Sequence, residues 1–566
     1  MIVQILLGTL LGSVPAVLVQ SPEQVPKTAP PLTIAAALAR MQARDPQGAA
    51  KILEALTELE PKNAAAWRNL AAAYQALEDY DMATGALLLA LELEPSVPTP
   101  LYALGVVRAL AGNSEEAFEW LMKARESHKI DMTQIDFDPA LEKLKTDARF
   151  NALHHAPKDF ADPFVEAVKV LREWDGEAAN DQFGWIARNI ADVDGDGVPD
   201  VVTSAPTHGA AASSAGRVYV YSTKGGKLLW TADGEPGAQL GTGVESAGDT
   251  NHDGIPDVIA SAPGAGKAFV YSGRDGRVLL TLAGEKPTDD FGRHASGAGD
   301  VDRDGFSDVI VGAPANSASG KQAGRAYVFS GKDGHILLTL SGEQPGDGFG
   351  STVSGFADKQ HLMLIVGAGS AGPQHTGRAY VYDSLASSAK FTIDSDATGG
   401  SLGGMFVSIP GDVDGDGTPD AYASDWLNSA LGPQTGRVYV HSGKDGRRLF
   451  ALTGETQGAG FGTSPSVAGD VDGDGHADLI VGAWQFSGAA VGAGKAYLHS
   501  GSDGRLLAAY TCRTPGDAFG FDAVTLGDID GDGTSDFLIT SAWSGVHGFH
   551  SGRVFIISSG IAKRAR

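Results

Sequence analysis

The stretch Gly411–Asp420 reads GDVDGDGTPD, and it determines how the rest of the chain is interpreted. Counted from Asp412, aspartates occupy positions one, three, five and nine, and glycine occupies position six. In a tight loop, residues one, three and five can point their carboxylates inward, glycine permits the sharp bend, and residue seven can offer its backbone carbonyl. Such carboxylates repel one another unless a cation lies between them. An all-oxygen, flexible, anionic cage suits Ca²⁺ better than Mg²⁺ or Zn²⁺.

The same spacing occurs in six places, so a set of ordinary Asp-Gly turns is a poor explanation. We expect up to six Ca²⁺ ions, one in each loop. Another stretch, FADKQHLML (Phe356–Leu364), keeps only Asp358 at the corresponding place, and there we predict a plain turn without metal. The expected ligands are Asp192, Asp194, Asp196 and Asp200; Asp249, Asn251, Asp253 and Asp257; Asp300, Asp302, Asp304 and Asp308; Asp412, Asp414, Asp416 and Asp420; Asp470, Asp472, Asp474 and Asp478; and Asp528, Asp530, Asp532 and Asp536.

The loops belong to a longer repeat with a period of about 57 residues, which occurs seven times. Each unit continues with an apolar strand that ends in Gly-Ala-Pro or a close variant, and then with a third strand of the type GRVYVY. An Asp-Gly or Gly-Gly turn leads into a fourth strand, which predicts a four-stranded antiparallel sheet for every repeat. The units begin at Phe183-Gly184, Leu240-Gly241, Phe291-Gly292, Phe349-Gly350, Leu402-Gly403, Phe461-Gly462 and Phe519-Gly520.

Four-stranded sheets repeated radially form a propeller, so we expect seven blades. The last repeat lacks its fourth strand. The segment just before the first repeat, VKVLREWDGE (Val168–Glu177), matches that missing strand. We therefore predict that it joins the last blade and closes the ring, which removes two exposed sheet edges.

The chain between Thr33 and Lys129 differs in character, because it is rich in Ala, Leu and Glu at helical spacing and contains almost no glycine. The unit Ala65–Pro95 resembles a tetratricopeptide repeat, and features recur at intervals of 34 residues. Asp136–Leu153 is expected to supply a capping helix. Such a stack either binds peptides or another domain, or only caps and spaces the region behind it. The matching positions are Trp67, Leu70, Tyr74, Tyr80, Ala83, Ala90 and Pro95.

The expected fold is therefore a multidomain α plus all-β protein, with a helical repeat stack followed by a seven-bladed propeller. The apolar start fits a secretory signal or a short membrane anchor, and no later segment approaches the ~20 apolar residues that a bilayer requires. The predicted boundaries are 1–20 for the signal or anchor, 21–32 for a linker, 33–153 for the helical domain, 154–163 for a second linker, 164–560 for the propeller and 561–566 for a basic tail.

The net charge of −26 disfavours nucleic acid and anionic lipid as partners. With the single cysteine Cys512, no intrachain disulfide can form, so packing and metal ions must provide stability outside the cell. We expect a secreted or cell-envelope protein.

The order of Phe-Gly, aspartate loop and Gly-Ala-Pro resembles the FG-GAP repeats of the integrin α-subunit propeller over residues 164–560. The resemblance implies seven blades with Ca²⁺ in the hairpin between the first two strands of a blade. This chain departs from that pattern by carrying loops in six blades, and it contains no Arg-Gly-Asp. Integrin-style heterodimer adhesion is therefore not expected.

Two classes of function remain. The first is a noncatalytic Ca²⁺-binding interaction or scaffold protein whose propeller and helical surfaces bind protein or glycan partners. The alternative is a propeller-based polysaccharide lyase or other carbohydrate-active enzyme, since some lyases and phospholipases carry related propellers. We find no nucleophile elbow, zinc signature or P-loop, and we predict no catalytic residue.

Three other features have simpler explanations than catalysis. His154-His155 is interpreted as part of a solvated linker, and the arginine that opens the third strand of most repeats as an ion-pair or packing position. Trp426, Trp484 and Trp543 recur at equivalent strand ends, where core packing is favoured over stacking on a sugar.

Overall fold

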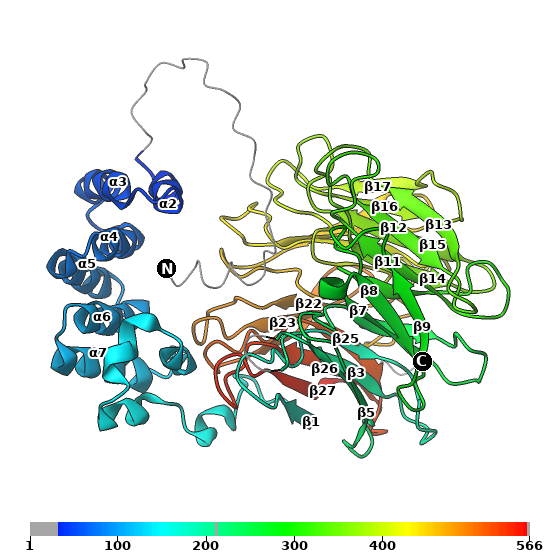
Figure 1. Cartoon of the computed structure of the whole chain (residues 1–566), viewed down its shortest axis with the longest axis horizontal. Coiled ribbons are helices and arrows are strands. Elements are labelled where there is room, and N and C mark those ends of the chain that lie inside the picture. Colours follow the sequence, from blue (N-terminus) through cyan, green and yellow to red (C-terminus); the bar gives the residue numbers. More distant parts are fainter. Residues whose placement is uncertain (1–31, 210–212, 563–566) are drawn as a thin grey trace. The chain divides into compact units, whose positions relative to one another are not determined.

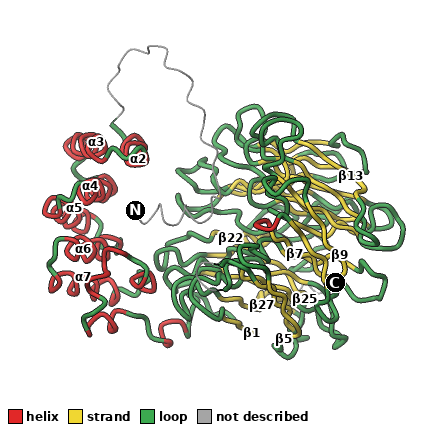
Figure 2. Tube along the Cα trace, viewed as in Figure 1, coloured by secondary structure: helices red, strands yellow, loops and turns green. Residues whose placement is uncertain are grey.

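The computed structural model describes residues 32–209 and 213–562, which form two compact units divided between His155 and Ala156 (Figure 1). Helices make up the first unit and strands dominate the second (Figure 2). No described helix has both the length and the apolar character needed to cross a bilayer. The predicted signal or anchor at 1–20, nearly all of the linker at 21–32 and the last four residues of the basic tail lie outside the described residues.

The first unit contains three consecutive pairs of helices, which fit tetratricopeptide-like repeats. Capping residues at intervals of 34, Asp45, Asp79 and Asn113, each accept a hydrogen bond from the backbone N–H three residues further on. Ala49 and Ala83 are fully buried, and their small side chains let paired helices approach closely. The helices are α2 (Ile34–Gln42), α3 (Pro46–Leu59), α4 (Ala64–Ala76), α5 (Tyr80–Leu93), α6 (Thr99–Leu110) and α7 (Ser114–Glu126).

The expected capping helix over Asp136–Leu153 is wrong in detail. The structure has short 3₁₀ turns there instead, because Asp138 and Asp147 each accept the backbone N–H two residues further on and start a new turn. His154 contacts the Asp136 carboxylate at 2.9 Å, and His155 lies 3.2 Å from the Met132 nitrogen. The turns are η1 (Met132–Asp136), η2 (Pro139–Leu144) and η3 (Ala148–Leu153), and η4 (Pro157–Phe160) follows in the second unit.

The second unit is the predicted seven-bladed propeller. The second strand of each blade is buried along nearly its whole length, because neighbouring blades cover both of its faces. Blades one to three consist of β2 (Ala187–Asn189), β3 (Val201–Ala205), β4 (Arg217–Tyr221) and β5 (Leu228–Asp233); β6 (Val244–Gly248), β7 (Asp257–Ala262), β8 (Lys267–Tyr271) and β9 (Val278–Ala283), with η5 (Pro263–Ala265) between β7 and β8; and β10 (Ala295–Gly299), β11 (Asp308–Ala313), β12 (Arg325–Phe329) and β13 (Ile336–Ser341).

The remaining blades follow the same order along the chain. They consist of β14 (Phe349–Ala357), β15 (Leu362–Ala368), β16 (Arg378–Tyr382) and β17 (Phe391–Asp394); β18 (Val407–Ser408), β19 (Ala421–Asp425), β20 (Arg437–His441) and β21 (Arg448–Thr453); β22 (Leu479–Ala483), β23 (Lys495–His499) and β24 (Leu506–Thr511); and β25 (Ala523–Gly527), β26 (Thr534–Ser541), β27 (Arg553–Ala562) and β1 (Val170–Asp175).

The predicted closure of the ring is confirmed. Strand β1 pairs antiparallel with β27, with Trp174 opposite Val554 and Asp175 opposite Arg553. The last sheet therefore has the order β1-β27-β26-β25, and its outer strand comes from the start of the propeller.

The recurring Phe-Gly dipeptide has a packing explanation. Phe349 is almost completely buried among the strands of its blade. The following Gly350 has a φ of +89°, and a Cβ there would lie 2.1 Å from the Arg325 carbonyl oxygen. Only glycine permits both that backbone conformation and that approach.

The sixth blade departs from the prediction of four strands in every repeat, because its sheet has three. Its inner segment contains Pro465, which has no N–H to donate to the ladder, followed by Ser466 with a φ of 68°. Only isolated bridges form there, between Val467 and Val524 and between Gly469 and Asp478.

The segment before β1 adds a contact that the repeat pattern did not predict. The Val165 nitrogen donates to the Thr511 carbonyl at 2.9 Å, and the Glu166 carboxylate accepts from the Thr511 nitrogen at 2.7 Å. Phe164 packs edge-on against Phe519 and Phe555. The chain therefore runs along the outer edge of blade six before it completes blade seven.

Candidate metal centres

All six aspartate loops join the first and second strand positions of a blade. Since these strands run in the same direction in every blade, the loops lie at the same end of the ring. The blade-four repeat has a tight hairpin between β14 and β15 instead, where Asp358 accepts hydrogen bonds from the nitrogens of Gln360 and His361, each at 2.7 Å. This is the plain turn that the sequence predicted.

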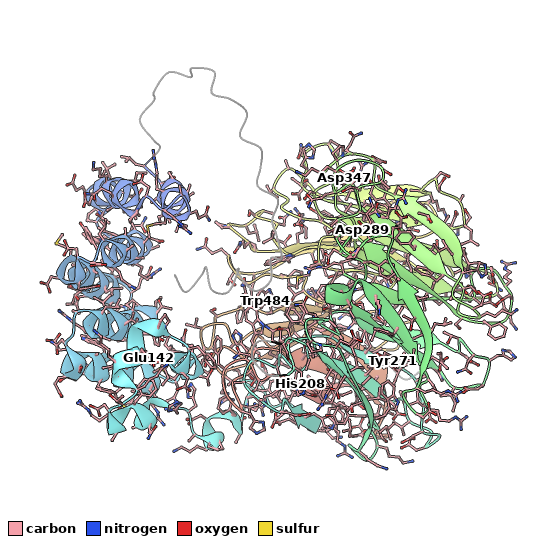
Figure 3. All side chains as sticks on the ribbon, viewed as in Figure 1. Glu142, His208, Tyr271, Asp289, Asp347 and Trp484 are labelled. Carbon is pink, nitrogen blue, oxygen red and sulfur yellow. The ribbon has the colours of Figure 1, made fainter. Side chains whose placement is uncertain are left out.

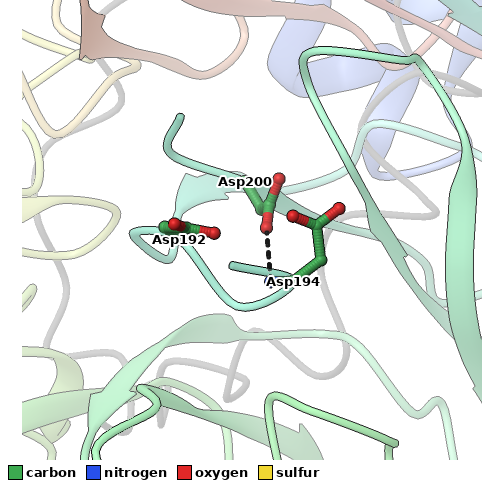
Figure 4. Close-up of side chains that lie close together, drawn as sticks. All are labelled: Asp192, Asp194 and Asp200. Atoms are coloured by element: carbon green, nitrogen blue, oxygen red, sulfur yellow. Dashed lines mark hydrogen bonds between the residues drawn. The ribbon is translucent and has the colours of Figure 1, made fainter. Parts of the chain in front are cut away.

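The loop of blade one shows how the spacing of the aspartates shapes the backbone around them (Figure 4). Asp192 at position one accepts hydrogen bonds from the Gly195 nitrogen at 2.7 Å and the Gly197 nitrogen at 2.8 Å. Asp194 at position three accepts from the Asp196 nitrogen at 3.1 Å. The backbone thus curls around its own carboxylates, and Gly197 at position six has the positive φ of +87° that this bend requires.

The aspartate at position nine anchors each loop to its sheet. Asp200 is completely buried, and its carboxylate accepts from the nitrogens of Val193 at 2.9 Å and Thr223 at 3.3 Å. Burial raises the pKa of Asp200 to about 6, and the charge of Asp194 acts in the same direction. Burial also raises the pKa of Asp308, Asp420, Asp478 and Asp536 to about 6.

A buried carboxylate that carries its charge at neutral pH gains from a nearby cation. In five loops, three carboxylate oxygens lie within 4.8 Å of one another. Positions one, three and nine form the group in blades one, five and seven, and positions one, three and five form it in blades three and six. The groups are Asp192, Asp194 and Asp200; Asp300, Asp302 and Asp304; Asp412, Asp414 and Asp420; Asp470, Asp472 and Asp474; and Asp528, Asp530 and Asp536.

The other predicted ligands lie in the same loops but outside these groups. They are Asp196, Asp308, Asp416, Asp478 and Asp532, together with the second loop, Asp249, Asn251, Asp253 and Asp257. In the second loop the Asn251 amide donates toward both oxygens of Asp257 at 3.3 Å, and the Thr250 hydroxyl donates to Asp257 at 2.6 Å. Hydrogen-bond donors therefore face the carboxylate that a cation would contact.

The donor set of the five grouped loops consists of carboxylate oxygens, which fits a hard divalent cation. Two histidines near the loops do not join it. His476 contacts the Val413 carbonyl at 2.9 Å, and His252 contacts the Gly305 carbonyl at 3.0 Å.

The recurring arginine of the third strand forms ion pairs, as expected. Arg217 binds Asp233 at 2.5 Å and Glu177 at 3.2 Å, and Arg437 binds Asp396 at 2.7 Å. Equivalent pairs are Arg325–Glu285, Arg378–Asp394, Lys495–Glu455 and Arg553–Glu173. These contacts hold neighbouring segments together.

The recurring tryptophans pack against one another, and two of the three lie in the protein core. Trp484, labelled in Figure 3, is 2% exposed, and Trp543 is 4% exposed. Their ring centroids lie 4.5 Å apart in an edge-on arrangement. Trp426 joins them at 6.2 Å from Trp484.

Sequence reasoning missed a polar group at the ring axis. The inner segments of all seven blades line a cavity of about 350 Å³, and Arg188, Glu245 and His294 are among the residues at its wall. Arg188 bridges blades by binding Glu245 at 2.8 Å and the buried carboxylate of Asp522. Burial lowers the pKa of His294 to about 3, and the charges of Arg188 and Arg293 act in the same direction. Aligning the repeats would have revealed Arg188 and Glu245, because the fourth residue after Phe-Gly or Leu-Gly is charged only in blades one and two.

Comparison with known proteins identifies the repeat. Residues 183–221, 241–280, 291–329 and 461–499 match the FG-GAP repeat. The chain is 32% identical over 170 residues to integrin alpha-PS5 of Drosophila melanogaster, covering 27% of this chain and 17% of that protein. It is 28% identical over 241 residues to integrin alpha-5 of Xenopus laevis, covering 38% and 22%.

A relative of a different kind is phosphatidylinositol-glycan-specific phospholipase D of Bos taurus, which is 33% identical over 163 residues, covering 25% of this chain and 19% of that protein. The chain thus spans about a fifth of the length of the curated relatives that it matches.

Proposed function

The propeller of this chain is built from FG-GAP repeats and is related to that of integrin alpha chains, and from this premise we propose a noncatalytic, Ca²⁺-stabilised interaction or scaffold protein. Its propeller and helical-repeat surfaces bind protein or glycan partners at the cell exterior or in the cell envelope. The observation that carries the proposal is the convergence of three carboxylate oxygens in each of five loops at one end of the ring.

The choice of Ca²⁺ follows from the ligands and from the backbone around them. Ca²⁺ accepts six to eight oxygens in irregular geometry, whereas Mg²⁺ requires a smaller, near-ideal octahedron. Asp192 accepts hydrogen bonds from three backbone nitrogens, which hold the loop curved around its carboxylates and leave room for the irregular coordination that Ca²⁺ tolerates. The second loop joins the five grouped loops when the Asn251 amide turns its oxygen inward, which gives up to six ions.

The first experiment counts bound Ca²⁺ by equilibrium dialysis with metal analysis. Asp412→Ala should remove about one ion per chain, because it removes a position-one carboxylate. The matched control is Asp358→Ala, which removes an aspartate from the blade-four turn and should leave the count unchanged. A chelator should also lower the unfolding temperature of the wild-type protein. If the wild type holds no Ca²⁺ and chelation leaves its unfolding temperature unchanged, the proposal is wrong.

A carbohydrate-active enzyme is the second candidate. The observation in its favour is the axial cavity, which is lined by His294, Arg188 and Glu245, residue types that other enzymes use in acid–base chemistry. Incubation with acidic polysaccharides, followed by measurement of the absorbance of unsaturated products, tests this alternative. Product formed by the wild type and lost in His294→Gln would replace the noncatalytic proposal.

Partners can be recovered from native extract in Ca²⁺ and in chelator, with the wild type and the Asp412→Ala variant in parallel. The noncatalytic proposal expects a partner whose retention depends on Ca²⁺ and weakens in the variant.

A further inference from the structure

A basic residue recurs at the start of the fourth strand of the blades. It follows the Asp-Gly or Gly-Gly turn and is Lys227 in blade one, Arg277 in blade two, Arg447 in blade five and Arg505 in blade six. In the last two it reaches the metal loop of its own blade. Arg447 donates to Asp414 at 2.8 Å, and Arg505 donates to Asp472 at 3.0 Å. Each of these aspartates occupies position three of its loop.

In blade seven the fourth strand is β1, which closes the ring by pairing with β27, and we call this pairing the ring seam. The equivalent basic residue therefore comes from the start of the propeller. It is Lys169, which directly precedes β1 as Arg447 precedes β21 and Arg505 precedes β24. The Lys169 ammonium lies 2.7 Å from Asp530 Oδ2 and 2.6 Å from Asp532 Oδ2. These aspartates occupy positions three and five of the seventh-blade loop.

The two oxygens that Lys169 contacts are those that the loop itself leaves free. Asp530 Oδ1 accepts the Asp532 nitrogen at 3.2 Å, and Asp532 Oδ1 accepts the Thr534 nitrogen at 3.0 Å. A cation entering this loop through Asp530 and Asp532 would therefore meet the ammonium of Lys169 at the oxygens that remain.

Lys169 also takes part in the backbone pairing that closes the ring. Its carbonyl accepts a hydrogen bond from the Ser558 nitrogen at 3.0 Å, next to the first β1–β27 pair, Val170 with Ile557. The loop that Lys169 contacts leads directly into β26, which pairs with β27. The side chain of Lys169 thus bridges the loop and the closing strand in a blade whose third and fourth strands, β27 and β1, are not joined by a hairpin.

We propose that Lys169 is a built-in counter-cation of the seventh-blade loop, which holds this loop and the ring-closing strand together without metal and is displaced when Ca²⁺ binds. The inference rests on the proposed binding of Ca²⁺. Lys169 contacts two carboxylates, whereas Arg447 and Arg505 each contact one loop carboxylate. The seventh loop should therefore bind Ca²⁺ more weakly than the loops of blades five and six, and its occupancy is linked to the ring seam.

The first test is calorimetric Ca²⁺ titration at low ionic strength, with Lys169→Met, which keeps the apolar stem and removes the charge. The Ca²⁺ affinity of one weak site, the seventh loop, should rise on the order of tenfold, since two partly exposed ion pairs no longer compete. Lys169→Arg, which keeps the charge, should stay near the wild-type value. An unchanged titration of Lys169→Met in a wild type that does bind Ca²⁺ overturns this inference alone.

The second readout is hydrogen exchange of residues 170–175 by mass spectrometry. In chelator, these amides should exchange faster in Lys169→Met than in the wild type, and in saturating Ca²⁺ the two proteins should agree. The matched control is Arg505→Met, which removes the equivalent residue of a blade with a covalent hairpin. It should strengthen one Ca²⁺ site and leave the exchange of 170–175 unchanged. Equal exchange of Lys169→Met and wild type in chelator contradicts the linkage to the seam.

A third measurement uses the wild type alone and does not depend on the folding of a variant. Amine labelling of Lys169, with the exposed Lys359 of the blade-four turn as internal reference, should be slow in chelator and several-fold faster in Ca²⁺. If Ca²⁺ binds and the labelling of Lys169 does not change, the ammonium is not displaced. If the wild type binds no Ca²⁺, the proposed function fails and the competition fails with it.

Discussion

At the scale of single residues, one amide separates the second aspartate loop from the others. Position three of the second loop is Asn251, and its NH₂ group faces the Asp257 carboxylate. In the other five loops position three is an aspartate, and its carboxylate is one of the three that lie close together. Carboxylate number is one of the properties by which oxygen-lined loops set their Ca²⁺ affinity. The second loop is therefore expected to be among the weakest sites.

Asn251→Asp should convert this loop into a stronger site. The added carboxylate removes the amide donor and supplies a ligand with almost the same shape, so the Ca²⁺ affinity of this loop should rise about tenfold or more. Calorimetric titration and metal counting at limiting free Ca²⁺ measure the change. Gln360→Asp adds the same charge to the blade-four turn, where no metal is expected, and should leave both readings unaltered. Identical titrations for Asn251→Asp and the wild type would show that carboxylate count does not limit this loop.

Residue spacing predicted which aspartates share a loop, because the one-three-five-nine pattern acts within ten residues. It did not predict Lys169 beside Asp530, nor Arg188 between Glu245 and Asp522. Those contacts join residues that are more than 50 positions apart, and they depend on which blades become neighbours in the ring.

At the scale of elements, the first strand of the propeller does more than fill a gap in the last sheet. The segment before it runs along β24, and Phe164 is 3% exposed between Phe519 and Phe555. The next residue, Val165, is 52% exposed. Adjacent positions therefore provide a buried and an exposed apolar side chain in the same backbone environment.

Phe164→Ala should lower the free energy of unfolding of the propeller by about 3–5 kcal/mol, because it leaves a cavity between two blades. Val165→Ala should change it by less than about 1 kcal/mol, since its side chain is mostly in water. Urea denaturation followed by tryptophan fluorescence measures both. Equal, small effects would mean that the segment before β1 does not contribute to the packing of blades six and seven.

Elements were predicted well where alternation and turn residues agree, as in the third strands and the hairpin of blade four. The errors fall where backbone chemistry overrides the repeat. Pro465 removes the inner strand of blade six, and the aspartates Asp138 and Asp147 divide an expected helix into 3₁₀ turns. Both could have been found by giving Pro and Asp more weight than periodicity.

At the scale of the whole molecule, the six loops gather much of the acidic excess at one end of the propeller, while the helical unit carries none of them. The closure of the ring could be predicted because the last repeat lacks a fourth strand and the segment before the first repeat matches that strand. How many loops bring carboxylate oxygens together could not, because that depends on side-chain positions in each loop.

Chelation should therefore act on one unit only. In scanning calorimetry, the propeller transition should move to lower temperature in chelator, and the transition of the helical unit should stay in place. Each independently occupied loop contributes about 2.7 kcal/mol when free Ca²⁺ is 100 times its Kd. Asp358→Ala should give the same difference between Ca²⁺ and chelator as the wild type. A parallel shift of both transitions would contradict the assignment of the metal to the propeller.

The pairing of β1 with β27 also has a consequence for the timing of synthesis. Glu173 and its partner Arg553 lie 380 positions apart, so a ribosome adding 5–20 residues per second makes β27 about 20–75 s after β1. During that time β1 is an edge strand without its neighbour. Its charged residues Arg172, Glu173 and Asp175 are of the kind that discourages pairing with other chains. Two of them, Glu173 and Asp175, bind Arg553 in the finished ring, so the side chains that hold the closed sheet also protect the nascent strand before its partner is made.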